Sequence, residues 1–428
     1  MQQQTDPRVT ALAQSARVAL EGGRADESAR LWGQVLSLAP DHSEALFNLG
    51  QHALYRKDAR AAVQMLERAL ALAPREPMVA LNLAFAHRAL GDAHGESAAL
   101  EKALAIDAYF YPALLAKAAL LERGGGKRQA ARIYKDVLKI VPPDGRLPRE
   151  LKPQIEHARA RVREDAQEMA AFLEARMGAT RARHAGADFS RIDECAEVAA
   201  GAKKAFVQAP TMLHFPRLPA IQYYDRAQFP WMADIEAETD AIREELIGLL
   251  REDAEGFRPY ITHPASVPLH QWAELNWSPR WSARYLWKDG AKQADVCARC
   301  PRAAAALAAI PRAEIPNFAP TAFFSALDPR TRIPPHSGDT NVRLIVHLPL
   351  IVPGDCHFRV GNDTREFKEG QAWVFDDTIE HEAWNDGDKP RVILIFDVWN
   401  PYLTAAERDL VGELLNGVND FYRAGQAG

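Results

Sequence analysis

A period of 34 residues organises the first third of this 428-residue chain and constrains its fold more than any other feature. Pro40, Pro74 and Pro142 occupy one position of the repeat, and Ala108 takes the place of the missing member. A similar apolar run leads to each of them: QVLSLAP, RALALAP, KALAIDA and DVLKIVP. A unit of this length cannot bury its apolar face alone, so the pattern predicts stacked copies that share one continuous core.

Two further registers repeat with the same period. The first marks the turn between two helices and comprises Gly23, Lys57, Gly91 and Gly125. The second places small residues where helices approach closely and comprises Gly50, Ala84 and Ala118. With these features the segment resembles the tetratricopeptide repeat (TPR), a family of stacked antiparallel helix pairs. The resemblance implies an all-α TPR solenoid of about four repeats over residues 7–143, with a groove for a peptide or protein, and the alternative is a non-repetitive helical bundle.

The chain changes character after the repeats. A charged, helix-forming run extends from Arg149 to Met177, and few strong signals follow it up to about Phe206. Residues 144–205 are therefore predicted to form connecting or capping helices and a linker. Eight of the nine tryptophans lie after residue 200, which indicates a differently built second domain over residues 206–428.

Composition excludes several classes of protein. The net charge is −5 and no basic stripe stands out, so nucleic acid is not expected as a partner. The sequence has no run of about 18 apolar residues that would predict a membrane span, and its start does not read as a signal peptide. Four cysteines fit a reducing compartment, and we predict a cytoplasmic protein. Cys297 and Cys300 lack a second pair, so they predict packed or redox-sensitive thiols and no zinc site.

Short β-rich runs separated by turn signals dominate the sequence after Arg332. They are NVRLIVHLPLIV, CHFRV, QAWVF and PRVILIFDVW. Many short strands with frequent turns predict a double-stranded β-helix, the jelly-roll or cupin-like fold, with flanking helices.

Histidines gather in this strand-rich region: His336, His347, His357 and His381. Imidazoles grouped on short strands are typical of a site for a borderline metal, although for His357 we predict a structural role. Non-haem iron sites usually add a carboxylate two residues after the first histidine, but that position is Gly338. Asp339 would point to the other face of a continuing strand. Spacing alone therefore leaves a metal site and a structural cluster both open.

Three longer motifs carry a second resemblance: PHSGDTNVRLIVHLPLIVP, FKEGQAWVFDDTIEHEAWN and PRVILIFDVWNPYLT. Residues 215–408 resemble the aspartyl/asparaginyl β-hydroxylase family, some members of which also carry tetratricopeptide repeats. The resemblance implies iron(II) held by two histidines and no carboxylate, here His336 and His381. It also implies 2-oxoglutarate as co-substrate and O2 as oxidant.

The same resemblance assigns the co-substrate contacts. Arg391 matches the family's anchor for the distal carboxylate, a task that suits the planar guanidinium fork. Ser325 matches a hydroxyl that bonds the same carboxylate, and His347 matches a histidine beside the co-substrate. Two residues depart from the pattern, because Ile345 replaces an arginine and Pro349 replaces a glycine. Arg343 has the same strand parity as Ile345 and is predicted to substitute in part.

The sequence thus predicts an iron(II)- and 2-oxoglutarate-dependent dioxygenase that hydroxylates an unactivated C–H bond. The family implies the β-carbon of Asp or Asn in a peptide or protein, held in the repeat groove. Two alternatives stay open: a hydroxylase of a small or lipid-like substrate, and an inactive TPR scaffold. We also hypothesise that Asp377 orients His381, because ligating imidazoles commonly donate to a carboxylate or carbonyl. The oligomeric state stays open.

Overall fold

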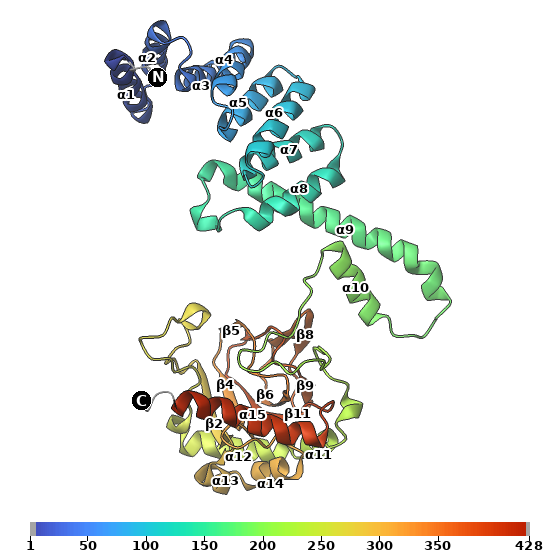
Figure 1. Ribbon diagram of the computed structural model, residues 1–428. Helices are drawn as coiled ribbons and strands as arrows, with labels where there is room; N and C mark the ends of the chain where they lie inside the picture. Colours follow the sequence, from blue (N-terminus) through green and yellow to red (C-terminus); the bar gives the residue numbers. More distant parts are fainter. Residues whose placement is uncertain (1–5, 425–428) are drawn as a thin grey trace. The chain divides into compact units, whose positions relative to one another are not determined.

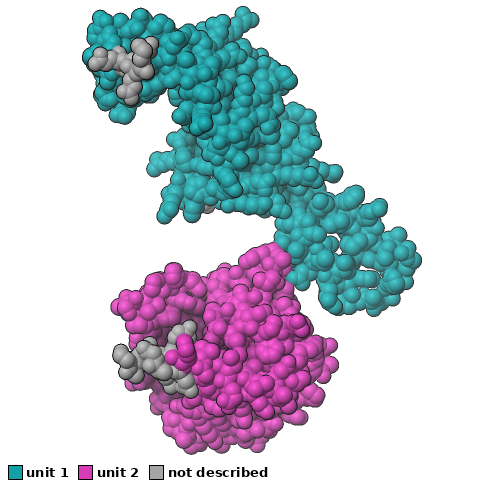
Figure 2. All heavy atoms as spheres, in the orientation of Figure 1, with its two compact units in different colours: residues 1–203 teal, residues 204–428 magenta. Residues whose placement is uncertain are grey.

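The chain forms two compact units that divide between Lys203 and Lys204. The computed structural model describes residues 6–424 (Figures 1 and 2). The predicted start of the second domain, residue 206, lies close to this division. Each unit has hydrophobic cores of its own, so each is described separately.

Four helix pairs build residues 7–140 of the first unit. They are α1 (Pro7–Glu21) with α2 (Ala25–Leu38), α3 (Ser43–Tyr55) with α4 (Ala59–Leu72), α5 (Pro77–Ala89) with α6 (Ala93–Ile106), and α7 (Tyr111–Arg123) with α8 (Lys127–Ile140). The second helices begin at intervals of 34 residues. The predicted all-α solenoid of four repeats is therefore present, and a non-repetitive bundle is excluded for this region.

The turn register has a conformational cause. Gly23, Gly91 and Gly125 have φ of 74°, 74° and 83°, and Lys57 has φ of 63° at the equivalent position. A left-handed residue ends the first helix of each pair, and glycine adopts this conformation without a Cβ clash. Lys57 has a Cβ and is therefore sterically strained in this conformation, unlike the three glycines.

Replacing Lys57 with glycine should raise the free energy of unfolding of the repeat unit by about 0.5–1 kcal/mol. The left-handed conformation costs an ordinary residue about 1–2 kcal/mol, and the extra freedom of unfolded glycine offsets part of the gain. Thermal unfolding of the wild type, Lys57→Gly and Lys57→Ala tests this. Alanine keeps the Cβ, so an equal gain from both substitutions would contradict the explanation.

The small-residue register marks close helix contacts. A Cβ built on Gly50 would lie 2.6 Å from Cγ of Leu66 on α4, and Ala84 and Ala118 are fully buried. Close packing therefore selects small side chains at these positions, as the sequence predicted.

The connecting region is helical. Two short 3-10 turns, Asp144–Arg146 and Arg149–Leu151, lead into α9 (Lys152–Ala182), and α10 (Ser190–Ala200) follows. Ile155 and Ala158 of α9 pack into the core formed by α7 and α8. The long helix therefore caps the last repeat at its start, as predicted for this charged segment.

Two antiparallel sheets form the framework of the second unit (Figure 1). The larger sheet has the order β1-β2-β4-β11-β6-β9, with β3 paired to β2, and the smaller sheet has the order β5-β10-β7-β8. The strands of the larger sheet are β1 (Arg258–Pro259), β2 (Trp281–Lys288), β3 (Ala291–Lys292), β4 (Ala322–Leu327), β6 (Arg343–Ile351), β9 (Trp373–Phe375) and β11 (Arg391–Trp399). Those of the smaller sheet are β5 (Thr331–His336), β7 (Cys356–Val360), β8 (Asp363–Glu366) and β10 (His381–Asn385).

Helices cover one face of the larger sheet. They are α11 (Met232–Ala237), α12 (Thr239–Glu252), α13 (Ala294–Arg299) and α14 (Pro301–Ala309). The C-terminal helix α15 (Ala405–Ala424) packs in a separate core with Ala313, Ile315 and Leu403. Alternate residues of β6 divide between two cores. Leu344, Val346 and Leu348 pack among residues of the helices, whereas Ile345 packs between the sheets. The inward face of the sheet is therefore left to build a site.

The four runs predicted as strands correspond to β6, β7, β9 and β11, but β5, β8 and β10 of the smaller sheet were not recognised. The segment TRIPPH contains Pro334 and Pro335, which cannot donate to a sheet ladder. β5 is tolerated because it lies at the edge of the smaller sheet, where one side needs no partner.

Cys297 and Cys300 are free, buried thiols in the core beneath the larger sheet. Burial raises the pKa of Cys300 to about 12. Of the two predicted roles, packed thiols are the one this environment fits, since a reactive thiol needs a low pKa. Across residues 6–424 we found no helix with both the length and the apolar character of a membrane span.

Candidate active site

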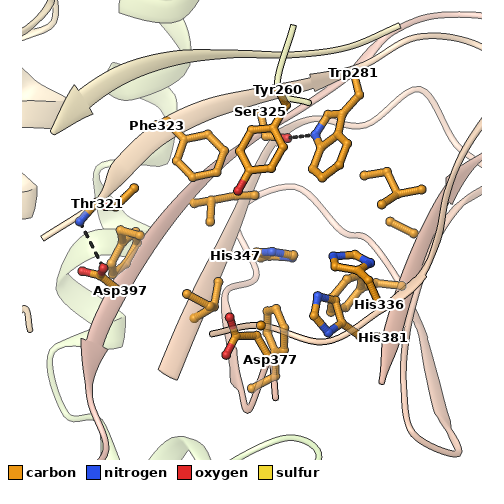
Figure 3. A pocket seen from close by; sticks show the side chains of 18 of the residues that line it. Tyr260, Trp281, Thr321, Phe323, Ser325, His336, His347, Asp377, His381 and Asp397 are labelled. Atoms are coloured by element: carbon orange, nitrogen blue, oxygen red, sulfur yellow. Dashed lines mark hydrogen bonds between the residues drawn. The ribbon is translucent and has the colours of Figure 1, made fainter. Parts of the chain in front are cut away.

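A cavity of about 230 Å³ opens between the two sheets of the second unit (Figure 3). All six residues predicted for the site line its wall or project into it: Ser325, His336, Arg343, His347, His381 and Arg391. They come from β4, β5, β6, β10 and β11. The sheets therefore assemble in one place residues that are far apart in the sequence.

His336 and His381 face each other across neighbouring strands. His336 ends β5 and His381 begins β10, and the two are paired residues of the antiparallel ladder. Their ring centroids lie 4.1 Å apart. Nδ1 of His336 donates to the carbonyl of Pro334 at 2.8 Å, and Nδ1 of His381 donates to the carbonyl of Ile379 at 3.0 Å. These bonds fix the tautomer, so each ring has the Nε2 lone pair left for a metal.

Burial keeps both imidazoles neutral. Desolvation lowers the pKa of His336 and places that of His381 well below its ordinary value, with His336 lowering the latter further. A metal binds the neutral form of imidazole, so the site is in the required protonation state at neutral pH. This pair therefore fits a divalent cation without prior loss of a proton.

Gly338 has no room for the carboxylate that the usual motif would place there. A Cβ on Gly338 would lie 2.0 Å from Oδ2 of Asp377, whose side chain occupies this space. The Gly338 amide donates to the Asp377 carbonyl at 2.7 Å and so joins the two histidine-bearing segments. Within residues 6–424 no cluster of three or more His, Cys, Asp or Glu that could hold a metal was found. His336 and His381 are thus the two residues at this site that could bind a metal.

Two predictions about acidic residues need correction. The carboxylate of Asp377 makes no bond to His381; the imidazole donates to the Ile379 carbonyl, and a hydrogen bond with the backbone of Asp377 also acts on it. β5 ends at His336, so Asp339 lies in the following turn rather than on the opposite face of a strand. Asp339 borders the cavity and accepts a bond from the Thr211 hydroxyl at 2.8 Å. Asp339 lies in the turn after β5 and Asp377 in the turn between β9 and β10, so turns, and not strand alternation, place these two carboxylates.

Asp377 makes stability depend on pH in the metal-free protein. Burial raises the pKa of this carboxyl to about 8, against the opposing effect of Arg343, and Oδ1 has no hydrogen-bond partner. The folded state therefore holds a proton that the unfolded state releases between about pH 4 and 8. Stability from this group is complete below pH 4 and is lost as pH rises through 8.

Asp377→Asn should remove this dependence. Over the window from pH 4 to 8 the wild type should lose about 1.4 kcal/mol of unfolding free energy per pH unit relative to the variant. Denaturant unfolding of both metal-free proteins at several pH values measures the difference. Parallel profiles would show that Asp377 is ionised in the folded state.

Arg391 is a buried cation without a carboxylate partner in the described part of the chain. Its side chain is 1% exposed, and Nε and Nη2 have no hydrogen-bond partner. Burial lowers the pKa of Arg391 to about 10. A buried guanidinium with unpaired donors is costly, and an anionic ligand would compensate its charge. Ser325 lies on the adjacent strand, where its Oγ accepts from Nε1 of Trp281 at 3.2 Å and keeps its own proton to donate.

His347 lines the same cavity and feels the charges of both Arg391 and His381. Burial, followed by the charges of Arg391 and His381, places the pKa of His347 well below its ordinary value. Its Nδ1 has no hydrogen-bond partner, and its ring packs against Phe358 and Phe375 at centroid distances of 4.7 and 4.8 Å. A neutral imidazole here has an unused nitrogen for a bound ligand.

Arg343 lies in the cavity wall with its charge already compensated. Nη1 bonds Oδ2 of Asp397 at 2.7 Å, and Asp397 is 1% exposed. The Thr321 amide donates to the same carboxylate oxygen at 3.1 Å. Ile345 is opposite Asp397 in the sheet and also lines the cavity. The two arginines therefore differ in their partners: Arg391 has donors free to bind an anion, whereas the guanidinium of Arg343 is bonded to Asp397.

Aromatic walls of the cavity were missed by sequence reasoning. Tyr260 stacks on Trp281 at 4.2 Å and on Phe323 at 5.4 Å, and Trp272 packs edge-on against His336 at 5.0 Å. Burial raises the pKa of Tyr260 to about 12. The three motifs do not contain these residues, and loops outside the core strands supply Tyr260 and Trp272.

His357 does not line this cavity. It is on β7 and stacks on Trp384 of β10 at 5.5 Å. The structural role predicted for it therefore agrees with its position.

The fold and the site define a two-histidine pocket between antiparallel sheets, with a free cation at one wall. Residues 236–401 match the model of the family described as aspartyl/asparaginyl β-hydroxylase. The second unit is therefore similar to this family over most of its length, and tetratricopeptide-like repeats precede it.

Similar proteins carry two kinds of name. An ornithine lipid ester-linked acyl 2-hydroxylase of Rhizobium tropici is 35% identical over 199 residues, which cover 45% of this chain and 66% of that protein. An aspartyl/asparaginyl β-hydroxylase of Mus musculus is 38% identical over 136 residues, which cover 30% of this chain and 17% of that protein. The chain thus spans less than two thirds of these relatives. A TPR protein of Thermus thermophilus covers 45% of the chain and is itself covered to 99%, with 17% identity and a TM-score of 0.32.

Proposed function

We propose that the second unit is an iron(II)- and 2-oxoglutarate-dependent hydroxylase of an unactivated C–H bond. The observation that carries the proposal is the combination, in one cavity, of two neutral imidazoles and the unpaired cation Arg391. The histidines suit a divalent metal, and the cation suits the far end of a dicarboxylate. A structural histidine cluster would not explain an uncompensated arginine.

The order of the strands supports a double-stranded β-helix as the catalytic fold. The core strands alternate between the sheets in the orders β4-β11-β6-β9 and β5-β10-β7-β8. A jelly roll of eight strands closes two sheets around a common interior in this way. We therefore retain the jelly-roll assignment as part of the proposal.

In this proposal His336 and His381 hold iron, and Arg391, Ser325 and His347 hold the co-substrate. When bound, the metal and 2-oxoglutarate supply the oxidising power for C–H hydroxylation with O2. The chain's own residues position these groups and shield them from water. Nδ1 of each of these histidines carries the proton and donates it to a backbone carbonyl, and this hydrogen bond orients the ring.

Exclusion of water is the second task of the chain. Tyr260, Trp281 and Phe323 form a stacked aromatic wall, and Trp272 covers the edge of His336. A dry pocket strengthens the pairing of Arg391 with a carboxylate and prevents side reactions of the oxidant.

Arg343 bears on the choice of substrate. The predicted target was the β-carbon of Asp or Asn in a peptide, and an aspartate would need a second free cation. Arg343 is the other arginine of the cavity, and its guanidinium is held by Asp397. We infer that the reacting part of the substrate is uncharged, which an asparagine side chain or an acyl chain satisfies. The name of the Rhizobium relative supports the acyl alternative.

Succinate release from 2-oxoglutarate tests the proposal with three substrates of matched concentration: an Asn peptide, its Asp counterpart and an ester-linked acyl lipid. Turnover above background with the Asn peptide or the lipid, and little with the Asp peptide, is expected. Preference for the Asp peptide would overturn the inference about charge. No iron-dependent turnover or co-substrate binding would leave an inactive TPR scaffold as the better account.

A further inference from the structure

The segment of residues 204–215, here called the strap, crosses both segments that carry the predicted metal ligands. The Ala209 amide donates to the Thr378 carbonyl at 2.8 Å, three residues before His381. The Thr211 amide donates to the Gly338 carbonyl at 2.9 Å, two residues after His336. The strap lies upstream of residues 236–401, the region that matches the family.

Gln208 joins the two segments through its side chain. Nε2 donates to Oδ2 of Asp376 at 2.6 Å, and Oε1 accepts from Nδ2 of Asn341 at 3.1 Å. Asp376 precedes His381 by five residues, and Asn341 follows His336 by five. One amide group therefore spans the distance between the two segments.

The partners of Gln208 are rigidly held. Asp376 and Asn341 are fully buried. Asp376 accepts from the hydroxyl of Thr378 at 2.6 Å, and Asn341 exchanges two hydrogen bonds with the backbone of Phe215 at the end of the strap. A buried network with all members satisfied tends to fix one arrangement, and loss of one member leaves others unpaired.

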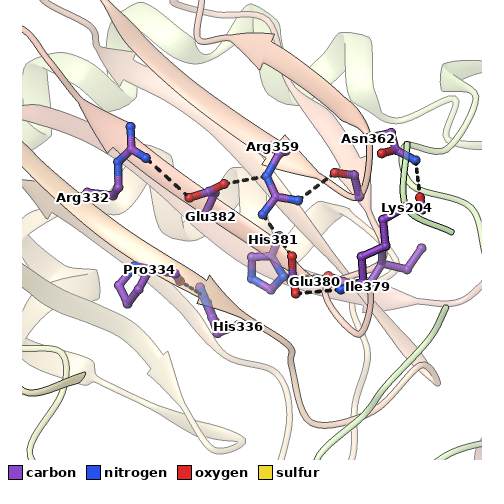
Figure 4. Close-up of polar contacts among 11 residues, drawn as sticks. Lys204, Arg332, Pro334, His336, Arg359, Asn362, Ile379, Glu380, His381 and Glu382 are labelled. Carbon is purple, nitrogen blue, oxygen red and sulfur yellow. Dashed lines mark hydrogen bonds and ion pairs between the residues drawn. The ribbon is translucent and has the colours of Figure 1, made fainter. Parts of the chain in front are cut away.

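The start of the strap contacts residues next to β10 and between β7 and β8 (Figure 4). Lys204 pairs with Glu380 at 3.4 Å, and its carbonyl accepts from Asn362 at 2.8 Å. Arg359 bonds Glu380 and Glu382, the two neighbours of His381, at 3.1 and 2.6 Å. The strap therefore reaches the residue before His381 as well as the turn before it.

We infer that the strap, through Gln208, is a positioning element that acts beside the β5–β10 ladder and the Gly338–Asp377 bond to hold the separation of His336 and His381. The inference rests on the proposed function. Within the described residues the two histidines are the predicted protein ligands, so metal affinity depends on the distance between the two segments that carry them. Gln208 touches neither histidine, so it acts through the backbone of residues 338–341 and 376–379.

Metal titration of the full-length chain tests the role of Gln208. Co(II), an air-stable substitute for iron(II), is the probe. Gln208→Ala should weaken Co(II) binding about tenfold, at the lower end of what outer contacts of metal sites contribute. Gln208→Glu should weaken it at least as much, because a carboxylate would face Asp376. Gln228→Ala is the control, since Gln228 loses one comparable bond, to Tyr402, away from the site.

A purely structural role would give a different pattern. Gln208→Ala would then lower the unfolding temperature with and without metal equally, and its Co(II) affinity would stay within about twofold of the wild type. That result overturns the inference. If Gln208→Ala does not fold, Thr211→Val removes the hydroxyl bond to Asp339, and an unchanged affinity there overturns it too. Failure of the wild type to bind Co(II) would overturn the proposed function itself.

Discussion

His381→Ala should reduce iron(II) affinity at least about 100-fold and abolish 2-oxoglutarate turnover. Even outer contacts of metal ligands contribute tenfold to 100-fold, and His381 is one of two imidazoles that face each other at 4.1 Å. Anaerobic addition of iron(II) and 2-oxoglutarate, followed by visible absorption, measures the effect. The wild type should show a weak charge-transfer band that the variant lacks.

His357→Ala is the matched control for this experiment. His357 is on β7, next to β10 in the same sheet, but stacks on Trp384 away from the cavity. It should keep the band and the affinity of the wild type. Wild-type affinity in His381→Ala would show that the metal, if it binds, uses other residues.

Arg391→Met should have opposite effects on stability and on binding. The metal-free variant should be more stable than the wild type by about 1–3 kcal/mol, because methionine removes an uncompensated buried charge and fills similar space. Binding of 2-oxoglutarate should weaken about 100-fold or more, the scale expected when one partner of a buried charged pair is lost. Thermal unfolding without ligand and co-substrate titration with iron(II) measure the two effects.

Arg284→Met separates this signature from general effects of losing an arginine. Arg284 is on β2 of the same sheet, but it bonds the Gly256 carbonyl and the carboxylate of Asp253 at 3.2 and 2.9 Å. Its loss should destabilise the protein and leave co-substrate affinity unchanged. If Arg391→Met destabilises the metal-free protein as well, Arg391 has a structural partner and is not a vacant anchor.

The repeat unit was determined almost wholly by local sequence. Its 34-residue period, the small residues at Gly50, Ala84 and Ala118, and the turn register all reappear as helix pairs. Each repeat contacts mainly its neighbours, so the pattern of a short stretch of chain already contains the packing that stabilises it.

The candidate site was predictable only in part. Strand alternation in β6 and the family motifs identified His336, His347, His381 and Arg391, and the structure brings these residues to one cavity. Sequence alone could not tell that Arg391 is unpaired while Arg343 bonds Asp397, because residues 343 and 397 meet only through pairing of β6 with β11.

Sequence motifs therefore determined the class of this protein and most residues of its site. Tertiary structure decided the charge state of each: burial keeps the imidazoles neutral and raises the pKa of Asp377. It also placed the Asp377 carboxylate in the space beside Gly338 that a side chain there would need. The hydrogen bonds of the strap to both histidine-bearing segments likewise exist only in the folded chain. The physical reason is that desolvation and hydrogen bonding depend on neighbours in space, which a sequence pattern does not contain.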